Sequence, residues 1–126
     1  MAFFTPEARE LIDYIADLNE KAKGNEFYKA NEYKPAITCY THSLRLQQNN
    51  AVVYANRGMC HLKIKQFRAA LADCTAAVQI DDGYTKAYLR RGIAHRRLEI
   101  VFALIGGIDA PKTLADRQKG QAARLF

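Results

Sequence analysis

The sequence predicts an all-α protein in which helical hairpins stack into a right-handed α-solenoid. The composition favours helix, because Ala, Leu, Lys, Arg, Glu and Gln are frequent and the 126 residues include only three prolines. Near the N-terminus, Leu11, Ile12, Ile15 and Leu18 recur at the spacing of one apolar helix face. The third and strongest observation is a period of 34 residues along the chain.

Glycines mark this period, since Gly24, Gly58 and Gly92 follow one another at intervals of 34 residues. The same interval joins Tyr33 to Phe67, Ala36 to Ala70, Tyr40 to Cys74, Leu44 to Val78, Tyr54 to Tyr88 and Arg57 to Arg91. A 34-residue unit of two helices is the tetratricopeptide repeat. Glycine inside a helix costs about 1 kcal/mol relative to alanine, so we expect these glycines where a neighbouring helix approaches closely. Ala36 and Ala70 should occupy the tightest crossing on the second helix of each hairpin.

The helices can be placed along the chain from the apolar spacing and the turn residues. They are predicted at about 6–30, 33–47, 51–64, 67–80 and 85–98 or beyond. Thr5 should cap the first helix, with Pro6 at its first position. We therefore expect 1–98 to form a repeat domain with an N-terminal leading helix, containing repeats at about 17–50 and 51–84 and an incomplete one at 85–98.

The segment 99–126 departs from the pattern. Leu104 stands at the position that should be small, and Gly106, Gly107 and Pro111 interrupt the rest of the repeat. Two outcomes are open: residues 85–105 form one long helix, or a short distorted second helix forms between about 101 and 112. Leu114 to Phe126 can form a further helix.

A missing second helix in the third repeat has an energetic consequence. It would expose apolar surface on the helix at 67–80, and terminal repeats need a polar cap. We expect the segment 99–126 to cap that face or to exchange with a second chain in a homodimer. The apolar run 100–105 is most simply buried core, or else an interaction patch.

Charge and hydropathy narrow the class of partner. The net charge of +6 and pI of about 9.3 favour an anionic partner: nucleic acid, anionic lipid or an acidic peptide. The longest apolar stretch is far shorter than a membrane span, and no basic region precedes an apolar core at the N-terminus. We therefore expect a cytoplasmic protein that does not insert into a membrane.

Cysteine and histidine residues predict no chemistry. Cys39, Cys60 and Cys74 lack metal-ligand spacing and are expected to be small packing residues. His61 and His95 share one repeat position and should pack between helices, and neither they nor His42 have a carboxylate or cysteine spaced to complete a site. We expect no enzyme activity, no bound metal and no cofactor.

Three runs of sequence resemble the carboxylate-clamp tetratricopeptide domains of heat-shock cochaperones. Residues 20–28 (EKAKGNEFY) look like the opening of such a domain, 54–57 (YANR) like its second repeat and 86–92 (KAYLRRG) like its third. The resemblance covers about 17–98. It implies binding of the acidic EEVD-type C-terminal peptide of the seventy- or ninety-kilodalton heat-shock chaperones. The family's five clamp side chains match Lys21, Asn25, Asn56, Lys86 and Arg90, and Lys63 matches a further basic position.

The spacing of these residues agrees with that expectation. In repeat register they lie three or four positions apart, so they share one face of the first helices, which line the concave surface of such a solenoid. Lysine and arginine cations and asparagine donors suit the two carboxylates of a C-terminal aspartate. Met59, together with Leu62, Leu89 and Ile93, is placed to accept apolar side chains further along the peptide.

Alternatives stay open at the level of sequence. Each cation taken alone could be ordinary solvated helix surface. Arg57, Arg91, Arg96 and Arg97 could form a basic stripe for nucleic acid, but no RNA-binding signature accompanies them, so nucleic acid is not the expected partner. The chain could also be a general scaffold that binds no chaperone, or a non-catalytic fragment of a larger enzyme that contains tetratricopeptide repeats.

Overall fold

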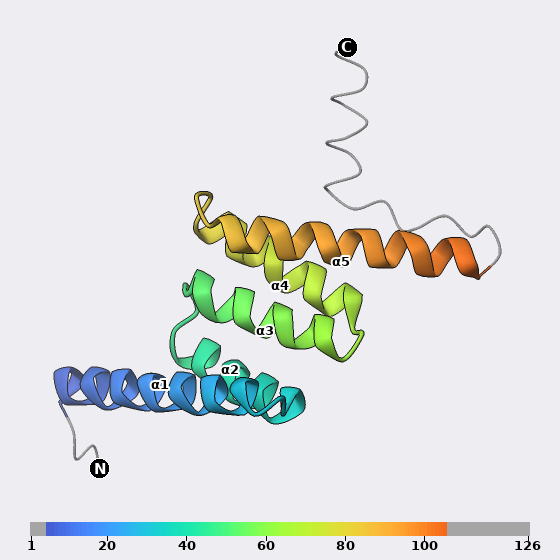
Figure 1. Cartoon of the computed structure of the whole chain (residues 1–126). Coiled ribbons are helices and arrows are strands. Elements are labelled where there is room, and N and C mark those ends of the chain that lie inside the picture. The colour runs from blue at the N-terminus through green and yellow to red at the C-terminus, as the bar shows by residue number, and fades with distance from the viewer. Residues whose placement is uncertain (1–4, 106–126) are drawn as a thin grey trace. The chain divides into compact units, whose positions relative to one another are not determined.

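A computed structural model describes residues 5–105, which form five helices (Figure 1). The helices are α1 (Pro6–Lys29), α2 (Tyr33–Leu46), α3 (Ala51–Lys63), α4 (Phe67–Ile80) and α5 (Thr85–Leu104). No strand occurs among these residues, and the predicted all-α class is confirmed. The ends of the first four helices lie within one residue of their predicted positions. The chain divides into two compact units, Met1–His95 and Arg96–Phe126. The division into 1–98 and 99–126 stays a prediction.

Local signals set the helix ends. The Thr5 hydroxyl accepts a hydrogen bond of 3.1 Å from the Ala8 N–H, and Pro6 begins α1, as predicted. Asn50 caps α3 in the same way. The turns inside the two hairpins place Asn31 and Lys65 at φ of 61° and 64°. Asparagine tolerates this left-handed conformation, whereas lysine adopts it at a cost.

The helices pack as two successive hairpins, α1 with α2 and α3 with α4, joined by contact between α2 and α3. Ala36 and Ala70 are fully buried, which confirms them as the small residues of their crossings. One core cluster lies between the hairpins and contains Ala36, Tyr40, Leu44, Val53 and Cys60. A second cluster contains Ala51, Ala55, Ala77, Val78 and Ala87, so the first turns of α5 pack on α3 and α4.

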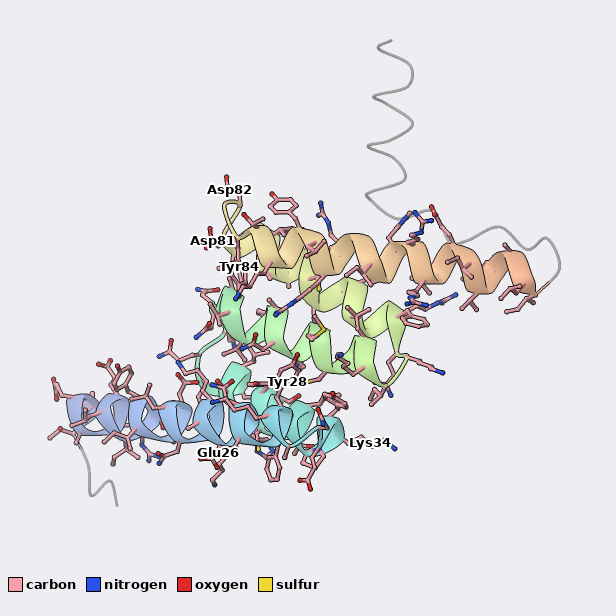
Figure 2. The ribbon with its side chains drawn as sticks, viewed as in Figure 1. Glu26, Tyr28, Lys34, Asp81, Asp82 and Tyr84 are labelled. Carbon is pink, nitrogen blue, oxygen red and sulfur yellow. The ribbon has the colours of Figure 1, made fainter. Side chains whose placement is uncertain are left out.

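The turn that leads from α4 into α5 is fixed by its own residues. Asp81, Asp82 and Tyr84 lie together there (Figure 2). The Gly83 N–H donates a 3.1 Å hydrogen bond to the Asp81 carboxylate, and the Tyr84 N–H donates to the Asp81 carbonyl oxygen at 3.2 Å. Aspartate commonly closes turns in this way. Since Tyr84 also packs against the second core cluster, the turn attaches the start of α5 to the second hairpin.

The three glycines of the repeat differ in their surroundings. A Cβ at Gly24 would lie 2.7 Å from the Tyr40 ring, and one at Gly58 would lie 2.8 Å from Cys74 Sγ. The expected close approach is therefore present in the first two repeats. At Gly92, no atom of the described residues lies within 4 Å of such a Cβ. Over the part of the chain that the structure describes, α5 has no helix across this glycine.

For the third repeat, the structure decides between one long helix and a short second helix as far as Ile105. Residues 85–104 form one continuous helix, so 101–104 extend α5 and do not begin a second helix. The expectation that the run 100–105 is buried core was wrong, because Leu104 is 82 % and Ile105 60 % exposed. The predicted helix at 114–126 lies outside the described residues.

The expected exposed apolar surface on α4 is confined to the end of that helix. Ala70, Cys74, Ala77 and Val78 of α4 are buried. Ile80 at the end of α4 is 40 % exposed, and Leu89 and Ile93 of α5 are 66 % and 39 % exposed. Ala77 and Val78 of α4 pack with residues of α3 and with Ala87 of α5, so α3 and the start of α5 cover this part of α4.

Alanine substitution at these glycines should therefore have opposite effects. Gly24→Ala should lower the free energy of unfolding by about 1–3 kcal/mol, since the buried Tyr40 ring has no room to move away. Gly92→Ala should instead raise it by up to about 1 kcal/mol through helix propensity. Urea unfolding of both variants measures the difference. A destabilised Gly92→Ala would show that this face of α5 is closely packed.

Candidate peptide-binding site

Lys21 and the residue one turn before it form an ion pair on α1. Lys21 Nζ lies 2.9 Å from Asp17 Oδ2, and the Asp17 side chain is only 1 % exposed. The other carboxylate oxygen accepts a 2.5 Å hydrogen bond from the Ser43 hydroxyl on α2. Lys21 is thus held against the helix by a buried carboxylate, while its side chain keeps 25 % of its surface exposed.

Asn25, one turn further along α1, is oriented from α2. The Tyr40 hydroxyl donates a 2.6 Å hydrogen bond to Asn25 Oδ1. Burial raises the pKa of Tyr40 to about 12, so this hydroxyl keeps its proton at physiological pH. Because the amide oxygen is engaged, the exposed Asn25 side chain presents its N–H₂ group as a donor.

Asn56 on α3 and Arg90 on α5 contact each other directly. Arg90 Nη1 donates to Asn56 Oδ1 at 3.3 Å, which again leaves the amide nitrogen to donate. The Arg90 charge also acts on Tyr40, partly opposing the rise in its pKa that burial causes. The Asn56–Arg90 hydrogen bond thus connects the second repeat with the third.

The remaining predicted site residues are less constrained. Lys86 and Lys63 are exposed, and Met59 and Leu62 are half-buried. Leu89 and Ile93 are exposed on α5, as a surface for apolar side chains requires. Within residues 5–105, no hydrogen bond or ion pair connects these side chains with Asn25 or Asn56, so their part in the site stays a prediction.

Arg57 is not a solvated surface residue, because its side chain is held between helices. Its guanidinium forms a bidentate pair with Asp73 of α4, at 2.8 and 2.7 Å, and donates to the Thr41 hydroxyl of α2 at 3.1 Å. It also lies 5.5 Å from the centre of the Tyr54 ring. Arg57 thus joins three helices, and the interpretation of it as solvated helix surface was wrong.

The three cysteines, His61 and His95 are packed among the helices, whereas the His42 side chain is 49 % exposed. Cys39, Cys60 and Cys74 are free and buried, as expected. His61 lies 2.8 Å from Gln66 and 3.5 Å from Asp73, and His95 is buried. Among the described residues, no group of these side chains with Asp or Glu has the arrangement of a metal site. None of the helices in that range is long and apolar enough to cross a bilayer.

Comparison with solved structures gives close matches over most of the chain. The second tetratricopeptide domain of Spaghetti (RPAP3), bound to the HSP90 peptide SRMEEVD, is 39% identical with a TM-score of 0.66; the match covers 70% of this chain and 81% of that domain. The second such domain of human RPAP3, in complex with the HSP70 peptide SGPTIEEVD, is 36% identical with a TM-score of 0.62, covering 76% and 88%. This chain belongs to the tetratricopeptide repeat family.

Its relatives are larger proteins. Sperm-associated antigen 1 of Mus musculus is 36% identical over 104 residues, which are 82% of this chain and 11% of that protein. The chain spans less than a quarter of the length of the curated relatives it matches first. No family model matches the sequence. The period of 34 residues and the solved domains therefore carry the assignment to the family.

Some residues that shape this site were missed from sequence. Asp17 stands four residues before Lys21, the spacing of an ion pair on a helix, and this signal was available. Tyr40 is fifteen residues from Asn25 in sequence. Its repeat equivalent is Cys74, so the period gave no indication of its hydrogen bond.

The pair of Arg57 and Asp73 should contribute strongly to stability. Arg57→Met leaves a carboxylate that is only 7 % exposed without its bidentate partner, so the free energy of unfolding should fall by about 2–3 kcal/mol. Urea unfolding of Arg57→Met, Asp73→Asn and the double variant measures the coupling. Arg91→Met is the matched control, because Arg91 has the same repeat position and stacks on Tyr88. Additive single-variant effects would contradict this assignment.

Alkaline pH should destabilise the fold before the arginines titrate. Burial raises the pKa of the Cys60 and Cys74 thiols from 9.0 to about 11, and that of Tyr40 from 10.0 to about 12. The unfolded chain loses these protons first, so stability is full below pH 9 and falls as pH rises through 11. Urea unfolding between pH 7.5 and 11 measures this, and Cys74→Ala should flatten the decline. Constant stability up to pH 11 would contradict it.

Proposed function

We propose that this chain is a peptide-binding module of the cochaperone or adaptor type. It binds the free, acidic, EEVD-type C-terminus of a seventy- or ninety-kilodalton heat-shock chaperone, through a carboxylate clamp made by Lys21, Asn25, Asn56, Lys86 and Arg90. The observation that carries the proposal is the common orientation of the two asparagines. Each has its amide oxygen engaged inside the protein and its nitrogen available to an acceptor.

The available groups match the ligand. A C-terminal aspartate offers two carboxylates close together, which accept hydrogen bonds and donate none. The site supplies two amide donors, the Arg90 guanidinium and the Lys21 and Lys86 ammonium groups. Charge-assisted hydrogen bonds contribute about 1.5–3 kcal/mol each, so a few of them give affinities in the micromolar range, about −8 kcal/mol.

The solved relatives support the same ligand class, since two domains at 39% and 36% identity were determined with peptides ending in EEVD. Met59 with Leu62, and the exposed Leu89 and Ile93, then serve the apolar residues before the end of the peptide. Lys63 meets their acidic neighbours. The module acts by binding and not by catalysis, in the cytoplasm.

A titration with the full chain tests the proposal. A peptide ending in Glu-Glu-Val-Asp with a free C-terminus should bind in the micromolar range, and its C-terminally amidated form should bind at least about tenfold more weakly. Added salt should weaken the binding of the free-acid peptide, because that binding depends on attraction between carboxylates and the cations of the site. Calorimetry or fluorescence anisotropy measures both peptides.

Matched lysine variants localise the effect. Lys86→Ala should weaken binding by more than about 1 kcal/mol, whereas Lys23→Ala, which removes the same charge from an exposed position beside Glu20, should change it little. Equal affinity for free and amidated peptides would reject the clamp and favour a general scaffold role. Loss of binding in both lysine variants would show that net charge alone attracts the peptide.

A further inference from the structure

The first repeat contains a buried polar pair that the second repeat replaces with alanines. Asp17 is 1 % exposed and Ser43 is fully buried, and a hydrogen bond of 2.5 Å joins them. The residues at the same repeat positions in the second repeat are Ala51 and Ala77. Both are buried members of a single core cluster. The hairpin can therefore pack with two small apolar residues here, and packing does not require a carboxylate.

The buried carboxylate has a second contact, and this contact leads to the binding site. Asp17 Oδ2 forms an ion pair with Lys21 Nζ at 2.9 Å, and among the described residues no group is hydrogen-bonded to that oxygen. Burying a carboxylate is costly unless it is paired. Asp17 is thus built to hold one cation, and that cation is the first residue of the clamp.

The pair changes what Lys21 offers to a ligand. An ammonium group has three donors, so Lys21 can still donate to a peptide carboxylate while its charge is paired with Asp17. A carboxylate bound to Nζ would lie about twice as far from Asp17 as from the ammonium, so repulsion by Asp17 cancels about half of the attraction. Holding Lys21 in place saves side-chain entropy on binding, but the lysine is already mostly enclosed, so the charge effect should dominate.

We propose that Asp17 is a specificity-determining residue of this site: a buried counter-charge that holds Lys21 and lowers the affinity of the clamp for a peptide carboxylate. This inference rests on the proposed function. It implies that the first repeat contributes a partly neutralised lysine, so discrimination among acidic C-termini depends more on the amides and on Lys86 and Arg90.

The test introduces the alanine pair of the second repeat at the equivalent positions of the first repeat. Asp17→Ala with Ser43→Ala installs the alanine pair that already packs at 51 and 77, so the variant should keep a cooperative thermal transition. It should bind the free-acid Glu-Glu-Val-Asp peptide about 3- to 10-fold more tightly than the unmodified chain, with a steeper loss of affinity on adding salt. Asp17→Asn, which keeps an acceptor for Ser43, should change both readouts in the same direction.

Two controls separate this effect from general changes. Asp13→Asn removes the same charge one turn earlier on α1, from a half-buried side chain, and should change affinity by less than about twofold at physiological salt. In a Lys21→Met background, removal of Asp17 should no longer tighten binding. Unchanged or weaker binding by both Asp17 variants would overturn the proposal, as would an equal gain from Asp13→Asn.

A measurement without peptide distinguishes the two proposals. Urea unfolding of Asp17→Asn, Lys21→Met and the double variant should show coupling between the two residues. No coupling would overturn the assignment of Asp17 as the counter-charge of Lys21, whatever the peptide does. Coupling together with equal binding of free and amidated peptides would reject the clamp itself, and with it the effect of Asp17 on affinity.

Discussion

The close approach of two helices at Gly24 is the constraint on which the first half of the site depends. Only a residue without a side chain lets the Tyr40 ring lie against α1, since a Cβ there would come within 2.7 Å of the ring. The ring is buried at this point, and its hydroxyl reaches the neighbouring residue, Asn25. Gly24 makes room for the Tyr40 ring. The Tyr40 hydroxyl then binds the amide oxygen of Asn25, which leaves the amide nitrogen as a donor.

Most of the fold could be predicted from the sequence, because the fold repeats. The interval between Gly24, Gly58 and Gly92 placed the helices, and Ala36 and Ala70 marked the crossings, since these are requirements of backbone approach. The irregular end could not be predicted in the same way. The apolar spacing alone left open whether Val101 begins a new helix or continues α5, and the structure shows that α5 continues with Leu104 82 % exposed.

The candidate site divides along a similar line. Asn56 and Arg90 occupy the same repeat position, one period apart, and the structure brings them into contact. The partners that modify the site do not repeat. Asp17 has alanine at its next equivalent, and Tyr40 has cysteine. Departures from the period therefore carry the information specific to this chain, whereas the period itself carries the fold.

The two left-handed residues, Asn31 and Lys65, lie one period apart, with φ angles of 61° and 64°. One is well suited to that conformation and the other is not, yet the chain adopts it at both places. The direction in which each second helix leaves its turn is thus a property that the backbone keeps when the side chain changes. In this molecule the backbone geometry of the two hairpin turns is more alike than the residues that form them.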